Sequence, residues 1–83
     1  MAIDLEVLKN HIQRALPGSE VMVTDLVGDG DHLQAVVISK DFEGKALLAQ
    51  HQLVMEPLRG LLKEQLHALA VKTYTPEQWK TKK

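Results

Sequence analysis

The fold of this 83-residue chain is decided by three consecutive segments: HLQAVVIS (residues 32–39), ALLAQHQLVMEPLRGLLKEQL (46–66) and HALAVKTY (67–74). The outer segments are mostly apolar, and the middle one has helical periodicity, which predicts strand, helical crossover and strand. If the two strands are neighbours, such a crossover makes them parallel. His32 and His67 then stand at the starts of the two strands. Neighbouring strands lie about 4.8 Å apart. Two imidazoles at one edge of a sheet are within reach of one metal ion or cluster.

The segment before this unit predicts a helix and a hairpin. Apolar residues recur at steps of three or four from Leu5 to Leu16, Asp4 is available near the helix start, and Pro17-Gly18 closes the helix. The segment 21–26 is short and contains several β-branched residues, which predicts a strand. Gly28-Asp29-Gly30 supplies turn residues before the strand at 32–39. We therefore expect a hairpin whose loop is longer than two residues.

The middle segment predicts helices that cover the sheet. Its apolar stripe is expected to face the core, and Pro57 is expected to divide the segment into two helices or to kink it sharply, with Pro57 in the first turn of the second part. The predicted stripe consists of Leu47, His51, Val54, Leu58, Leu61 and Leu62.

The C-terminal part predicts a strand over residues 68–74 and a short capped helix. Leu69, Val71 and Thr73 alternate with smaller or charged residues, so these three are expected to face the helices, while the other face is partly wet. Thr75 is the expected cap, with Pro76 first in the helix and Gln78 at the capping-box position. Trp79 is expected to fold back on the sheet edge.

The complete order is helix, strand, strand, helix, helix, strand, in one domain over residues 1–83. It predicts an α+β fold with a three-stranded mixed sheet and helices on one face. This order resembles the class II KH-like topology.

Composition narrows the possible functions. The chain is 45% apolar and 25% charged, as in ordinary globular proteins, and it has no cysteine, which excludes disulfides and thiolate ligands from this chain. Ten basic and eleven acidic residues give a net charge of −1, without the excess positive charge of a typical nucleic-acid-binding domain. No apolar run approaches a membrane span, and no secretory start is recognisable, so the cytoplasm is the expected location and no membrane contact is expected.

Patterns that would indicate an enzyme are missing from the sequence. We find no activated serine or cysteine nucleophile, no glycine-rich phosphate loop and no HExxH pattern. Asp29 and Asp31 alternate as in a calcium loop, but the remaining ligands of such a loop do not follow, and solvated turn residues explain them better. The chain is therefore expected not to be an enzyme.

Several motifs resemble the BolA-like family. The segments FEGKALLAQHQLVMEPL (42–58) and LHALAVKTYTPEQW (66–79) are similar to that family's phenylalanine-x-glycine-lysine helix start, helical histidine and histidine-alanine strand. GDGDHLQ (28–34) resembles the branch with a histidine, rather than a cysteine, in the hairpin loop. One departure is Gln50, which stands where an arginine often precedes the helical histidine; we expect it to alter only the local helix surface.

The resemblance implies a partner of monothiol glutaredoxins. BolA-like proteins pair with these glutaredoxins, and the pair can share a [2Fe-2S] cluster whose thiolates come from the glutaredoxin and glutathione. By motif match, the ligands from this chain would be His67 and His32, with no cofactor when the chain is alone. Imidazole in place of thiolate raises a cluster's reduction potential. The implied roles are iron-sulfur trafficking, iron homeostasis and redox regulation.

Each histidine also has a simpler interpretation. The simpler interpretation of His67 is a strand-start residue bonded to a backbone carbonyl, and that of His32 is a polar loop residue. His51, the third metal-ligand candidate, is better explained as a helix residue hydrogen-bonded at the border of the core. His11 is assigned no role.

The competing function is nucleic-acid binding by a KH-like transcription regulator. KH domains use a GxxG loop, and no two of the chain's five glycines have that spacing. A basic patch would have to form from dispersed lysines, and DNA binding and homodimerisation stay open. The lysines concerned are Lys40, Lys45, Lys63, Lys72 and Lys80.

Overall fold

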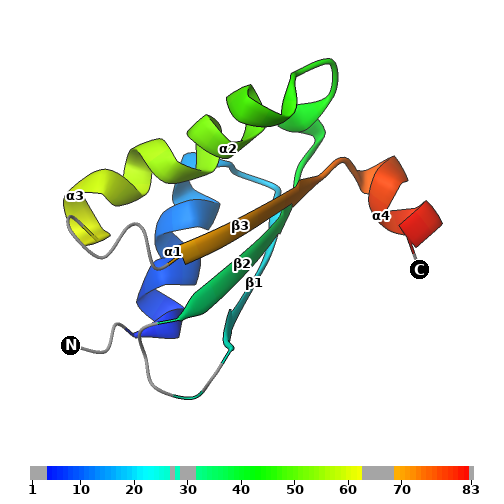
Figure 1. Cartoon of the computed structure of the whole chain (residues 1–83). Coiled ribbons are helices and arrows are strands. Elements are labelled where there is room, and N and C mark those ends of the chain that lie inside the picture. Colours follow the sequence, from blue (N-terminus) through cyan, green and yellow to red (C-terminus); the bar gives the residue numbers. More distant parts are fainter. Residues whose placement is uncertain (1–3, 27, 29–31, 63–68, 83) are drawn as a thin grey trace.

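A computed structural model describes residues 4–26, 28, 32–62 and 69–82 of the chain (Figure 1). Its elements follow the predicted order, with two short 3₁₀ helices added. They are α1 (Leu5–Ala15), β1 (Glu20–Asp25), β2 (Leu33–Ile38), η1 (Lys40–Phe42), α2 (Leu47–Met55), η2 (Glu56–Leu58), α3 (Arg59–Leu62), β3 (Leu69–Tyr74) and α4 (Pro76–Lys82).

The sheet has the order β1-β2-β3 and is mixed. β1 pairs with β2 antiparallel, with Val21 opposite Val37, and β2 pairs with β3 parallel, with Leu33 opposite Leu69. The helices α1, α2 and α3 lie on one face of this sheet (Figure 1). The predicted α+β fold and the parallel pair joined by a helical crossover are confirmed, and the arrangement is compatible with a class II KH-like topology.

The core lies between the sheet and the helices. In β3, Leu69 and Thr73 are buried and Val71 is half-buried, whereas Ala70 and Lys72 are exposed, which confirms the predicted alternation. The opposite face of the sheet is partly open, with Met22 of β1 41% exposed. The largest fully buried side chains are Phe42, Leu8, Ile12, Leu58, Val37 and Val54.

The start of α1 and the division of the central helical segment at Pro57 are as the sequence predicts. An Oδ1 atom of Asp4 accepts a hydrogen bond from the backbone N of Glu6 at 2.9 Å, as expected for an N-cap. Pro57 lies in η2, which separates α2 from α3, so the predicted division is confirmed. Within the described ranges, no helix is both long and apolar enough to cross a membrane.

The predicted buried stripe is confirmed at Val54 and Leu58, which are fully buried, and is wrong at Leu47, which is 62% exposed. Gln50, outside the predicted stripe, is buried, and Leu48 is 71% exposed. The helix LLAQHQLVM is apolar on most of its circumference, so its sequence periodicity does not single out one face. The hydrogen bonds of Gln50 select the buried face instead.

Gln50 joins three parts of the molecule from inside. Its Nε2 donates to the carbonyl oxygens of Phe42 at 3.2 Å and Lys45 at 2.9 Å, and its Oε1 accepts from Thr73 Oγ1 at 2.6 Å. Gln50 is 8% exposed and Thr73 is 7% exposed. The expectation that Gln50 affects only the helix surface is therefore wrong, because its amide links the η1 turn, α2 and β3.

The C-terminal helix begins with the predicted capping box. Gln78 N donates to Thr75 Oγ1 at 3.1 Å, and Thr75 N donates to Gln78 Oε1 at 2.9 Å. The Trp79 ring packs 5.3 Å from the Tyr74 ring at an interplanar angle of 55°. Trp79 therefore folds back on the end of β3, as predicted.

Removing this cap should destabilise the protein measurably. We expect Thr75→Ala to lower the free energy of unfolding by about 1 kcal/mol, because the backbone N–H of Gln78 at the start of α4 loses its acceptor, Thr75 Oγ1. Thr81→Ala on the exposed surface of the same helix is the matched control, expected to change stability by less than about 0.5 kcal/mol. Urea unfolding followed by circular dichroism measures both, and equal effects would contradict a specific role for the cap.

Candidate functional site

The predicted histidine site begins at the N-terminal end of the central strand. His32 directly precedes β2, and its side chain is exposed. Its backbone carbonyl accepts a hydrogen bond from Leu26 N at 2.8 Å, which closes the β1–β2 hairpin. The next residue, Leu33, is buried in the core with 4% exposure. The backbone at His32 and at the residue that follows it is therefore anchored.

The parallel register brings the start of β3 to the same edge. Leu33 is the direct partner of Leu69. His67 comes two residues before Leu69 in the sequence but lies outside the described residues. The expected alignment of the two strand starts is confirmed by Leu33 and Leu69, and the ligand role of His67 stays a prediction.

The hairpin loop leaves β1 through a side-chain-stabilised turn. Asp25 Oδ1 accepts a hydrogen bond from Gly28 N at 2.9 Å, and Gly28 has φ +77°, which favours glycine. Asp29 and Asp31, considered above as turn residues, lie outside the described residues. Within the described part of the chain, no three histidine, aspartate or glutamate side chains gather where they could hold a metal ion.

The other two histidines lie on helices. His51 is half-buried on α2, between the buried Gln50 and the exposed Gln52. His11 on α1 is half-buried, and its Nδ1 lies 3.1 Å from the carbonyl oxygen of Val7 in the preceding turn. This contact is local to α1. The ligand role considered for His51 stays a prediction.

Two features of the structure had no clear sequence signal. Gln50 is buried between elements that are 8 and 23 residues away along the chain, at Phe42 and Thr73. A groove at the opposite end of β2 from His32 combines residues from three separate segments, 17–20, 38–41 and 76–80. A single sequence does not show which residues far apart along the chain lie close together in the fold.

Comparison with known proteins agrees with this fold and with the motifs. A sequence model of the BolA-like protein family matches residues 3–78. Human BolA-like protein 2 is 37% identical over 81 residues, which cover 95% of this chain and 93% of that protein. The Escherichia coli acid stress protein IbaG is 32% identical over 73 residues, covering 87% and 83%.

A solved structure extends the likeness to three dimensions. The structure of a BolA protein homologue from Coxiella burnetii matches with a TM-score of 0.78 at 35% identity, covering 94% of this chain and 97% of that one. The small α+β domain with a mixed three-stranded sheet is thus of the BolA type. The chain belongs to the BolA-like family.

Proposed function

We propose that this protein is a non-enzymatic partner of a monothiol glutaredoxin and that the two proteins share a bridging [2Fe-2S] cluster. His32 and His67 are the proposed ligands from this chain. The role would be iron-sulfur trafficking or iron and redox regulation in the cytoplasm. The observation that carries the proposal is the parallel register of β2 and β3, with Leu33 opposite Leu69.

The register supports a two-histidine site because only one or two residues of chain separate each histidine from a residue of the paired strands. His32 is one residue before Leu33, and His67 is two residues before Leu69. One or two residues of chain span at most about 3.6 and 7 Å. Because adjacent strands are about 4.8 Å apart, two imidazoles attached this close to paired residues can reach one iron, which supports the proposal.

The donor set of this chain fits a shared cluster better than a cluster of its own. The sequence has four histidines and no cysteine, so thiolate ligands must come from another molecule. A bridging cluster would supply iron whose remaining ligands are sulfides and the partner's thiolates, and which can accept neutral imidazole. His32, with its exposed side chain beside an anchored backbone, suits a ligand that must meet a partner's surface.

The proposal is tested by titrating the protein anaerobically into a cluster-loaded monothiol glutaredoxin. We expect a new visible absorption and circular dichroism spectrum that saturates at a one-to-one ratio, because imidazole changes the electronic environment of the iron. Bovine serum albumin at equal concentration controls for nonspecific effects on the cluster. An unchanged spectrum at excess protein would contradict the proposal.

A second measurement, the salt dependence of binding to duplex DNA, distinguishes the cluster-sharing function from nucleic-acid binding. Binding to duplex DNA would weaken by about 0.9 log units per log unit of salt for each phosphate neutralised. The cluster-bridged complex should instead depend on iron, sulfide and glutathione. Steeply salt-dependent DNA binding together with an unchanged cluster spectrum would favour the transcription-regulator alternative.

A further inference from the structure

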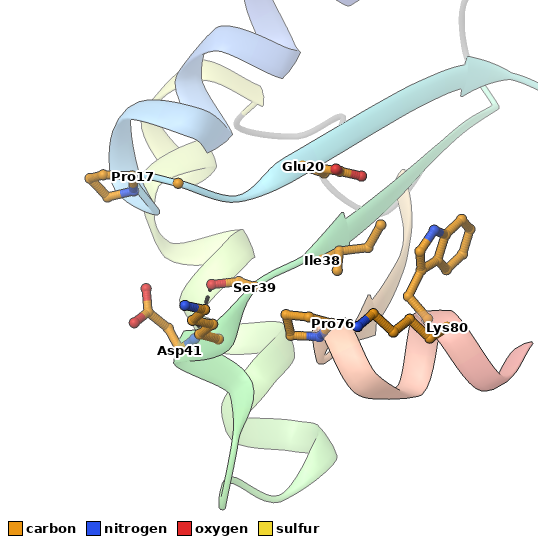
Figure 2. Close-up of a pocket in the computed structure, with 10 residues that line it drawn as sticks. Pro17, Glu20, Ile38, Ser39, Asp41, Pro76 and Lys80 are labelled. Atoms are coloured by element: carbon orange, nitrogen blue, oxygen red, sulfur yellow. Dashed lines mark hydrogen bonds between the residues drawn. The ribbon is translucent and has the colours of Figure 1, made fainter.

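A groove lies at the end of the sheet opposite His32. A cavity of about 520 Å³ has Ile38 of β2 as an apolar floor, with Pro17 and Pro76 on its walls and Trp79 beside it. Figure 2 shows Glu20 from β1 near Ile38 and the Lys80 side chain extending from α4 toward Pro76. Apolar floors with a few charged groups at the rim are typical of binding sites.

The groove continues across α4 into a second cavity. This cavity has a volume of about 470 Å³ and shares three residues with the first: Lys40, Pro76 and Lys80. The two cavities meet at these shared residues, which include both lysines of the groove. The result is an open, elongated depression rather than a closed pocket for a compact small molecule.

The charges alternate along this groove. Glu20 and Asp41 line only the first cavity, the two lysines line both, and Glu43 and Glu77 line only the second. Within the described part of the chain, none of these six groups forms an ion pair with another, although an Arg59–Glu56 pair exists elsewhere. The groove thus presents an acidic, basic, acidic sequence of charges that do not neutralise one another by direct pairing.

We propose that this groove binds an extended peptide segment of a partner protein in which an acidic side chain lies between two basic ones. In an extended chain, residues i, i+2 and i+4 point to the same side, so a basic-x-acidic-x-basic segment presents three charges complementary to those of the groove. The side chains at the intervening positions point to the opposite side of the peptide, away from these charges. Charge complementarity of this kind sets specificity and orientation.

The groove is separate from the proposed cluster site. His32 precedes β2 and Ile38 ends it, so the strand itself, six residues at about 3.3 Å each, lies between the two. A peptide bound in the groove therefore leaves the histidine edge accessible. Failure of peptide binding would not affect the cluster proposal, and the reverse also holds.

The chain contains a built-in reporter for this test, because Trp79 is its only tryptophan. The probe is the synthetic peptide acetyl-Arg-Leu-Glu-Leu-Arg-amide, which does not fluoresce in this range, titrated into the full chain. We expect a saturable change in tryptophan fluorescence. The charge-reversed peptide acetyl-Glu-Leu-Arg-Leu-Glu-amide, with the same residue types, is expected to bind at least about tenfold more weakly.

Variants locate the binding. Lys80→Glu should weaken binding of the first peptide at least about tenfold, because the acidic residue of the peptide then meets a like charge. Lys45→Glu makes the same charge change outside both cavities and should leave the affinity within about twofold. No saturable change up to millimolar peptide, equal binding of both peptides, or equal effects of the two variants would overturn the proposal. A fluorescence change that depends on protein concentration alone would assign the groove to a second copy of this chain and overturn it as well.

Discussion

Gln50→Ala is expected to lower the free energy of unfolding by about 2–4 kcal/mol, a large fraction of the stability of a domain this size. The substitution removes the amide that donates to Phe42 O and Lys45 O and accepts from Thr73 Oγ1. The partners stay buried, and each buried polar group without a hydrogen bond costs about 1–3 kcal/mol. The melting temperature should fall by at least about 10 °C, measured by circular dichroism.

The chain provides a matched control two residues away. Gln52 is exposed on the same helix, and Gln52→Ala should change stability by less than about 0.5 kcal/mol. A double-mutant cycle with Thr73→Val isolates the Gln50–Thr73 bond, for which we expect a coupling energy of about 1 kcal/mol or more. If Gln50→Ala and Gln52→Ala lower the free energy of unfolding by the same amount, the buried amide does not hold α2 against β3.

The second large effect concerns the proposed cluster. His67→Ala should abolish the spectrum of the shared cluster, and His32→Ala should shift the spectrum or shorten its lifetime, because each substitution removes a proposed nitrogen ligand. Association with the apo glutaredoxin should change less than the cluster does. Visible circular dichroism of the complex and calorimetry without cluster measure the two properties separately.

The His11→Ala variant controls for the general loss of an imidazole. His11 lies on α1 and contacts the backbone of its own helix, so its loss should leave the cluster spectrum unchanged. Thermal unfolding of the variants separates ligation from folding. A His67→Ala protein that is unfolded would mean that the residue is structural, and wild-type spectra in both His32→Ala and His67→Ala would reject the ligand assignment.

The order of elements was determined by local sequence signals. Asp4 at the start of α1, Pro57 between the two central helices and the Thr75–Gln78 capping box all act within a few residues, so their effects can be recognised without tertiary structure. The parallel relation of β2 and β3 also followed from sequence, because a helical crossover within one sheet permits no other direction. For the same reason, the sequence alone placed His32 at the start of a central strand.

The tertiary structure alone decided which face of α2 is buried. Leu47 and Gln50 have the opposite exposures from those their polarity suggests: Leu47 is 62% exposed, and Gln50 is buried because its amide is hydrogen-bonded to Phe42, Lys45 and Thr73. It also decided that residues near 17, 20, 38, 40 and 80 line one groove. Both results depend on contacts between residues far apart along the chain, and such contacts are set by packing of the whole domain rather than by any local pattern.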